Sequence, residues 1–207
     1  MSELERALKV LHPEDRPIEL RPIMPDGRWW TGLYDDRSKL AAAVKSLNEI
    51  EAKAVYWSIN PISPSLAGRV TNRLGPAKKG MCVANKDIER IRWLFLDIDP
   101  KPSREAAYTL AASVKTHLQA RGWAEPVFVD SGNGCYLYYA VDLAPDQKGL
   151  IKKVVGSLKS RFDLPEAIID PKCVNPGRIA RVPGSYNRKD DPRLARILSV
   201  SASQNHP

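Results

Sequence analysis

The chain has 207 residues, of which 43% are hydrophobic and 27% are charged. A chain of this length can bury a substantial core, in one domain or in two small fused lobes, and its composition is that of an ordinary soluble globular protein. No apolar run is long enough to span a bilayer and no signal pattern opens the sequence, so we expect a cytoplasmic protein without a membrane partner.

The formal net charge of +8 favours a polyanion such as nucleic acid as a partner, although a merely soluble basic surface is the alternative. The three cysteines, Cys82, Cys135 and Cys173, are widely spaced and form no Cys-x-x-Cys pair. This spacing argues against a disulfide framework, and we expect no structural zinc.

The N-terminal part of the chain predicts a small α/β module at residues 1–90. Its segments are strands at 18–21 and 27–34, a helix at 37–51, a strand at 54–59, and an irregular stretch at 62–90 that is rich in Pro, Gly, Lys and Arg. We assign no helix to the first residues, which contain turn formers and apolar residues.

From residue 91 onward the predicted order is strand, helix, strand, strand, helix, strand. The segments are a strand at 93–99, a helix at 104–121, a hairpin of strands at 127–130 and 135–141, a helix at 146–162, and a short strand at 167–170, with 178–182 following. This is the split βαβ order of an RRM-like sheet with helices on one face, so the predicted class is α/β (α+β). We predict such a module at 91–198 and a polar, disordered tail at 199–207.

The segment Trp93–Pro100 places two carboxylates at the end of a buried strand. Side chains alternate along a strand, so Asp97 and Asp99 should point to the same side. A divalent cation with oxygen ligands is the usual way to offset such like charges. Asp170 ends a later apolar run, and the first and last strands of a split βαβ sheet can lie close together. Three carboxylates holding two divalent ions would suit phosphoryl transfer, whereas the alternative is that Asp-Pro at both places is only a strand-ending turn.

Other polar residues have both a functional and an ordinary interpretation. The segment Ser131-Gly132-Asn133-Gly134 lets backbone amides approach a phosphate, but Asn-Gly is also a common hairpin turn. Arg178 and Arg181 suit phosphate binding, yet their spacing on a regular strand puts them on opposite faces unless a bulge intervenes. The five tryptophans could stack on bases, although core packing is their more frequent role. Further basic residues that could contact a nucleic acid are Arg69, Arg73, Lys78, Lys79, Lys172, Arg188 and Lys189.

Taken together, these segments resemble the archaeo-eukaryotic primase superfamily, in its bacterial, phage and plasmid primase–polymerase branch. The WLFLDIDP segment at 93–100 is similar to the branch's first metal-binding motif, and Asp130–Gly134 to the start of its second. Ile169-Asp170, followed by NPGRI at 175–179 and PGS at 183–185, is similar to its third motif and the basic segment after it. The resemblance spans about residues 18–198, with order and spacing preserved.

The resemblance implies an N-terminal α/β module packed on an RRM-like catalytic module. It also implies synthesis of primers on single-stranded DNA from NTPs or dNTPs, with two Mg²⁺ or Mn²⁺ ions and a replicative helicase as a partner. The catalytic metal ligands would be Asp97, Asp99 and Asp170. The nucleotide would be held by Ser131, Gly132, Asn133, Gly134, Tyr136, Arg178 and Arg181.

One position departs from the family pattern. The second motif normally has a histidine where this chain has Tyr136, and a tyrosine hydroxyl carries no positive charge near neutral pH. Activity would then be weaker, nucleotide choice altered, or another basic group would substitute. Tyr136 favours one rival function, a weak or inactive relative that acts as a DNA-binding replication-initiation module. A second rival is a metal-dependent nuclease, because carboxylate clusters with bound metal also hydrolyse phosphodiesters.

Overall fold

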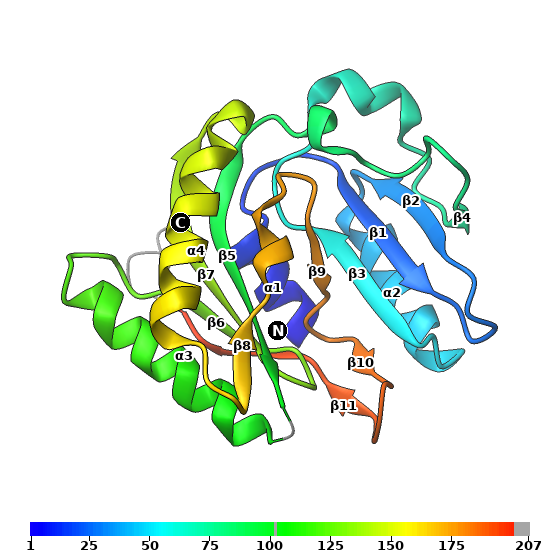
Figure 1. Ribbon diagram of the computed structural model, residues 1–207. Helices are drawn as coiled ribbons and strands as arrows, with labels where there is room; N and C mark the ends of the chain where they lie inside the picture. The colour runs from blue at the N-terminus through cyan, green and yellow to red at the C-terminus, as the bar shows by residue number, and fades with distance from the viewer. Residues whose placement is uncertain (102, 201–207) are drawn as a thin grey trace.

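The computed structural model describes residues 1–101 and 103–200. Two five-stranded sheets stand side by side, one built mainly from the first third of the chain and one mainly from the rest (Figure 1). The first sheet has the order β4-β2-β1-β3-β9, and the second has the order β12-β6-β7-β5-β8. The predicted mixed α/β class is confirmed.

The N-terminal sheet is antiparallel throughout. Its strands are β1 (Ile18–Ile23), β2 (Trp30–Tyr34), β3 (Ala54–Ser58), β4 (Gly75–Pro76) and β9 (Ile179–Arg181). Helix α2 (Arg37–Glu49) begins where the Asp36 carboxylate accepts the backbone N–H groups of Ser38 and Lys39, a helix N-cap. Its buried residues Leu40, Val44 and Leu47 have helical spacing and join the core beside this sheet.

A further helix, α1 (Glu3–Leu11), lies at the start of the chain, where the sequence analysis assigned none. Ser2 and Glu5 form a capping box that fixes its first turn. Leu4, Ala7 and Leu11 are buried at helical spacing. The helix contacts the far end of the chain, because Arg6 Nη1 donates to the carbonyl oxygen of Ile197 at 3.0 Å.

The second sheet contains the predicted split βαβ unit. Its strands are β5 (Ile91–Pro100), β6 (Val127–Asp130), β7 (Cys135–Leu143), β8 (Ala167–Ile169) and β12 (Arg196–Ser199), and its helices are α3 (Arg104–Gln119) and α4 (Lys148–Phe162). Both helices cover the same face (Figure 1). The edge strand β12 pairs with β6 and was not predicted, because its four residues carry no clear alternation.

The N-terminal sheet also contains a strand from beyond residue 90, where we placed the boundary between the two modules. β9 follows the RRM-like segment in sequence, yet it pairs with β3 of the N-terminal sheet, with Tyr56 opposite Arg181. Residues 178–182 therefore belong to the first sheet and cross between the modules. The expected tail began at residue 199, but Ser199 is the last residue of β12; residues 201–207 of that tail lie outside the described residues.

Short elements complete the chain. They are the β10–β11 hairpin (Tyr186–Asn187 and Arg193–Leu194) and the 3₁₀ turns η1 (Pro64–Arg69), η2 (Asn85–Asp87), η3 (Pro145–Gln147) and η4 (Pro171–Val174).

One continuous cluster of buried apolar side chains, including Trp57 of β3 and Phe95 of β5, joins the two sheets. Each such large side chain contributes roughly 1.5–3 kcal/mol when fully buried.

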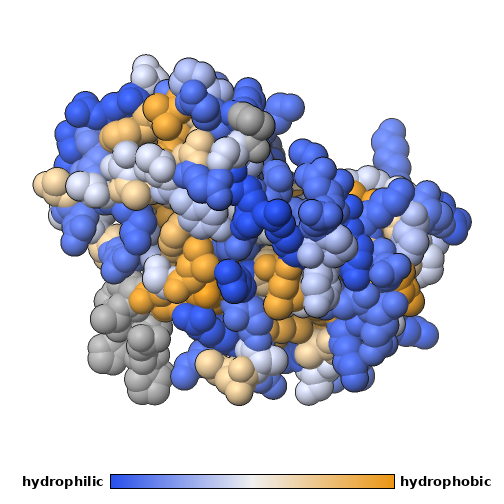
Figure 2. Space-filling view, turned by 90° about the horizontal axis from the view of Figure 1, so that it is seen from below, coloured by the Kyte–Doolittle hydropathy of each residue, from blue (hydrophilic) through white to orange (hydrophobic). Residues whose placement is uncertain are grey.

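Seen from below, hydrophilic residues cover most of the face and apolar residues gather towards its middle (Figure 2). In the described part of the chain, no helix combines the length and the apolar character that crossing a bilayer requires.

Candidate functional site

The carboxylates Asp97, Asp99 and Asp170 come from neighbouring strands of the second sheet. β5 and β8 pair antiparallel, with Ile98 opposite Ile169, so the end of β8 lies beside the acidic end of β5. The backbone N–H of Asp170 donates to the carbonyl oxygen of Asp97 at 2.8 Å. Asp97 and Asp99 are two residues apart on β5 and share the face that α3 and α4 leave open. The expected proximity of the first and last strands is thus observed.

A single guanidinium group lies between two of these carboxylates. Arg178 Nη2 donates to Asp97 Oδ2 at 3.0 Å and to Asp170 Oδ2 at 2.9 Å. The other oxygen of Asp170 accepts the Lys172 backbone N–H at 2.8 Å and caps η4. The turn-forming role considered for Asp170 is therefore real, and it coexists with a position in the carboxylate cluster.

The electrostatics of the cluster call for positive charge. Burial, followed by the charge of Asp99, raises the pKa of Asp97 to about 7, even though Arg178 acts to lower it. Burial and the Asp170 carboxylate also raise the pKa of Asp99. Burial alone would lower the pKa of Arg178, but Asp97 and Asp170 outweigh it and the net shift is upward. One arginine therefore does not fully offset the three carboxylates.

The donor chemistry of this cluster fits a hard divalent cation, because all three candidate ligands are carboxylates. No three His, Cys, Asp or Glu side chains in 1–101 and 103–200 are already arranged as a metal site. Arg178 stands where a cation shared by Asp97 and Asp170 would lie, and its buried Nε has no hydrogen-bond partner. A cation at this place would therefore take over the role of Arg178 against the carboxylates.

A cleft of about 640 Å³ opens in front of the cluster, between the two sheets. One side comes from β5, β7 and the β6–β7 turn, and the other from β1, β3 and β9 with the segment after it. The predicted site residues that line it are Asp97, Asp99, Ser131, Asn133, Tyr136, Arg178, Arg181, Arg188 and Lys189. Residues that are distant in sequence are thus gathered at one cavity.

The β6–β7 turn is held by its own hydrogen bonds. The N–H of Gly132 donates to Asp130 Oδ1 at 2.7 Å, and the N–H of Gly134 donates to Ser131 Oγ at 3.1 Å. A Cβ on Gly134 would lie 2.2 Å from the carbonyl oxygen of Ile98, so only glycine fits there. The two glycines shape the turn, while Ser131 and Asn133 face the cleft.

Tyr136 occupies the position where the family pattern has a histidine. It lies opposite Asp97 in the β5–β7 pairing and is only 6% exposed, packed against Phe95 with ring centroids 5.0 Å apart. Burial and the Asp97 charge raise the pKa of its hydroxyl, and the Arg181 guanidinium opposes that rise. The positive charge of Arg181 thus acts on the Tyr136 hydroxyl, so Arg181 is the basic residue that could replace the missing histidine.

Two solved structures share this architecture. The crystal structure of primase RepB′ matches with a TM-score of 0.55 at 12% identity, over 98% of this chain and 58% of that chain. The polymerase domain of Mycobacterium tuberculosis Ligase D in complex with DNA matches with a TM-score of 0.60 at 15% identity, over 95% of this chain and 78% of that chain. The chain has the primase–polymerase fold.

The chain spans less than two thirds of the length of the RepB′ structure. No protein-family model matches the sequence, and no curated protein matches it either. The likeness in three dimensions is thus far stronger than the likeness in sequence.

Within the primase–polymerase fold, the predicted DNA-binding residues fall into separate groups. Arg188 and Lys189 line the cleft itself. Arg69 and Arg73 line a second groove of about 400 Å³ next to β2 and β4, and Lys78 and Lys79 are exposed in the segment that follows it. Lys172 is exposed in η4, two residues after Asp170. Of these seven residues, Arg188 and Lys189 line the cleft beside the carboxylates.

Sequence reasoning missed several residues of the cleft. Lys53, Tyr56 and Asn187 line it and were not named from the sequence, and Trp29 lines it too but was considered only as one of five tryptophans that could stack on bases. Arg104 at the start of α3 donates to both oxygens of Asp130, at 2.8 and 2.9 Å, and holds the β6–β7 turn from behind. The adjacent tryptophans Trp29 and Trp30 gave a signal, but only the sheet register shows which of them faces the cavity.

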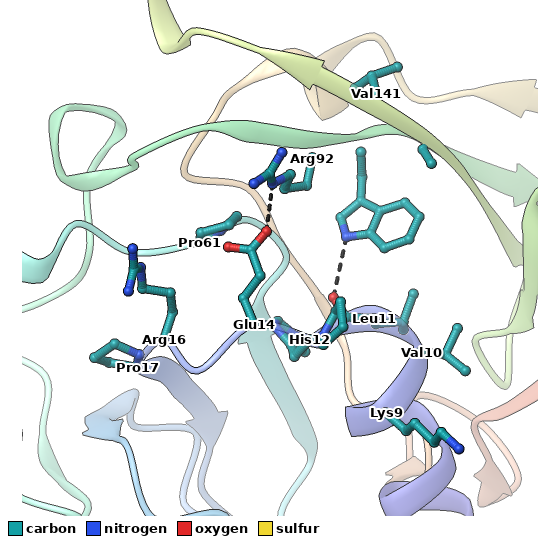
Figure 3. A pocket seen from close by; sticks show the side chains of 13 residues that line it. Lys9, Val10, Leu11, His12, Glu14, Arg16, Pro17, Pro61, Arg92 and Val141 are labelled. Atoms are coloured by element: carbon teal, nitrogen blue, oxygen red, sulfur yellow. Dashed lines mark hydrogen bonds and ion pairs between the residues drawn. The ribbon is translucent and has the colours of Figure 1, made fainter. Parts of the chain in front are cut away.

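A further cavity, of about 390 Å³, lies at the opposite end of β5 from the carboxylates. Figure 3 shows Val10, Leu11 and Pro61 on its walls, with the Arg92–Glu14 ion pair across it. The indole N–H of Trp93 donates to the carbonyl oxygen of Leu11 at 3.3 Å. Its lining includes one carboxylate, Glu14, which is already paired, so we do not place the chemistry there.

Proposed function

We propose that this protein is a metal-dependent nucleotidyltransferase that synthesises primers on single-stranded DNA. One observation carries the proposal: Asp97 and Asp170 converge on Arg178, with Asp99 beside them, at the base of a cleft that also contains basic side chains. Clustered carboxylates with raised pKa values in a cleft are typical of a functional site. The shared primase–polymerase fold supports this choice among metal-dependent phosphate reactions.

In this proposal Asp97, Asp99 and Asp170 hold two Mg²⁺ or Mn²⁺ ions. When bound, these ions would lower the pKa of the attacking hydroxyl and offset charge on the leaving pyrophosphate. The reaction forms a bond between a 3′-hydroxyl oxygen and the α-phosphorus of an NTP or dNTP, and breaks the bond from that phosphorus to the pyrophosphate oxygen.

The side chains around the carboxylates would bind and orient the triphosphate. Arg178 and Arg181 present planar guanidinium groups to the cleft, which suit bidentate contacts with phosphate oxygens. Ser131 and Asn133 supply neutral donors from a turn that its own hydrogen bonds keep in place. Arg188 and Lys189 lie at the same cavity, where they could hold the triphosphate or the template backbone.

A second function is favoured by one residue, Tyr136. Its buried hydroxyl cannot supply the positive charge of the family histidine, which would suit a weak or inactive relative that binds DNA at replication initiation. In the primase proposal Arg181 takes over that charge. The choice between the two functions thus depends on whether the chain makes product.

The test is a primer-synthesis assay on labelled single-stranded DNA with Mn²⁺ and either NTPs or dNTPs. Template-dependent products that disappear with EDTA are expected. Intact DNA binding without product would instead support the binding module. Shortening of the template in the absence of nucleotides would support the nuclease.

A further inference from the structure

Trp29 is the most exposed tryptophan of the described chain and lies on the wall of the cleft. Its side chain is 44% exposed, whereas Trp57 and Trp93 are buried. An aromatic ring of this size in contact with solvent forgoes the stabilisation that burial would give. Its position therefore needs an explanation other than core packing.

The ring of Trp29 is held in place by a neighbouring aromatic side chain. It stacks on Tyr56 with ring centroids 6.0 Å apart and an interplanar angle of 21°. Tyr56 is itself fixed by Arg181, whose guanidinium carbon lies 4.9 Å from the ring centroid and whose Nη2 donates to the hydroxyl at 3.2 Å. Trp29, Tyr56 and Arg181 thus form a continuous row along one wall of the cleft.

The register of the N-terminal sheet explains this row. Tyr56 lies opposite Arg181 on β9, and Ile23 forms bridges to both Ala54 and Trp29, so these side chains share one face of the sheet. That face looks into the cleft, while residues of alternate positions such as Trp57 point into the core. Trp29 is therefore presented to the cavity by the backbone and not by a chance rotamer.

Positive charge accompanies the exposed ring. Lys53, Arg188 and Lys189 line the same cleft, and none of them forms an ion pair with another residue of the described ranges. A basic groove combined with an exposed aromatic ring is the usual arrangement for single-stranded nucleic acid, in which bases stack and phosphates meet cations. These cations would have no phosphates to contact if the ligand were a nucleobase without its sugar-phosphate backbone.

We propose that Trp29, supported by Tyr56, is a stacking platform for a base of the single strand that enters the cleft, with Lys53 contacting the adjacent phosphate. This inference rests on the proposed function in that the strand is the template. It assigns template binding to the N-terminal sheet and leaves the chemistry to the second sheet. The platform is sequence-tolerant, because every base offers a π-face.

The test is titration of the full chain with short single-stranded oligonucleotides in EDTA, followed by tryptophan fluorescence and by anisotropy of a labelled strand. Wild-type fluorescence should fall on binding, and Trp29→Ala should lose most of that change and about tenfold in affinity. Trp29→Phe should keep most of the affinity while losing the fluorescence change. An unchanged quench in Trp29→Ala would overturn the proposal.

Two controls separate stacking from charge and from damage to the fold. Trp123→Phe should keep the full quench, since Trp123 packs on Tyr139 outside the cleft lining. An abasic oligonucleotide of the same length carries the same phosphates and should bind without quenching, and equal quenching by it would contradict stacking. Quenching by a free nucleoside triphosphate at the concentration at which the oligonucleotide acts would contradict assignment to the strand.

The platform and the proposed reaction can fail separately. Binding in EDTA does not depend on catalysis. If the protein makes no primers but shows the Trp29-dependent quench, the stacking platform is supported and the primase proposal is contradicted. If Trp29→Ala makes primers as well as wild type at template concentrations below saturation, the primase proposal is supported and the stacking platform is contradicted.

Discussion

The two ends of β5 place charged side chains in opposite situations. At the end that leads to Pro100, Asp97 and Asp170 share one guanidinium, and the pKa of Asp97 is raised to about 7, chiefly by burial. At the other end, Arg92 donates to Glu14 at 2.6 Å and to Asp142 at 2.5 Å, in a half-exposed setting.

The difference lies in whether the charges are satisfied within the protein. Asp142 also accepts from Arg90, and that hydrogen bond lowers the pKa of Asp142. The arginines therefore favour the charged form of Asp142, whereas burial disfavours the charged form of Asp97. At one end of β5 the carboxylates are paired with arginines, and at the other the negative charge is only partly balanced. A cation would therefore be stabilised at the second end.

The largest expected effect comes from neutralising a carboxylate at the acidic end. Asp97→Asn should reduce primer synthesis by about 10³-fold or more, because loss of a metal ligand removes several kcal/mol of transition-state stabilisation. Initial rates with Mn²⁺ at saturating nucleotide measure this. Activity within tenfold of wild type would remove the metal role from Asp97.

His12 gives the next largest effect, on stability at the opposite end of β5. Burial, followed by the charge of Arg37, lowers the pKa of His12 to about 3 from an unfolded value of 6.5. Below pH 6.5 the unfolded chain takes up a proton that the folded chain refuses, so stability falls as the pH falls, by up to about 1.4 kcal/mol per pH unit. Urea unfolding of wild type and His12→Gln between pH 7 and pH 5 measures this, with a flatter profile expected for the variant. Parallel profiles would contradict it.

Arg178 tests the competition between an arginine and a cation. Arg178→Met should destabilise the protein by about 2 kcal/mol in EDTA, because Asp97 and Asp170 lose their shared counter-charge. Mn²⁺ should then raise the melting temperature of the variant more than that of wild type. Arg181→Met is the matched control, since Arg181 contacts Tyr56 and no carboxylate of the cluster, and its Mn²⁺ response should equal that of wild type. Equal responses in all three proteins would argue against a cation at this place.

The smallest expected effect comes from breaking the ion pair at the far end. Glu14→Gln should cost under about 1 kcal/mol of stability and leave primer synthesis unchanged, because half-exposed pairs contribute little and Arg92 keeps Asp142. Thermal unfolding together with the synthesis assay checks both parts. A loss of synthesis would mean that the two ends of β5 are coupled.

Much of the second sheet could be predicted from the sequence. The WLFLDIDP segment and the hairpin turn at 131–134 are local signals, and their strands lie within a few residues of the expected places. The proximity of Asp170 to Asp97 also followed, because the split βαβ order fixes which strands are neighbours.

Pairings between distant segments could not be predicted in the same way. β9 and β12 have three and four residues, and their partners β3 and β6 lie far away in sequence, so no local period records the pairing. The place of Arg178 between two carboxylates depends on β9 crossing to the first sheet. The exposure of Trp29 depends likewise on sheet register, which the adjacent tryptophan residues do not reveal by themselves.

The crossing of β9 has a consequence for how the protein forms on the ribosome. Arg181 and Tyr56 meet across 125 positions of sequence, so β3 emerges long before the strand that completes its sheet. The aspartates of β5 are also made well before Arg178. When residues 178–181 are synthesised, β9 can pair with β3 and Arg178 can reach the carboxylates in the same step. A nascent chain that ends before this segment has an unpaired edge on β3 and no assembled cleft.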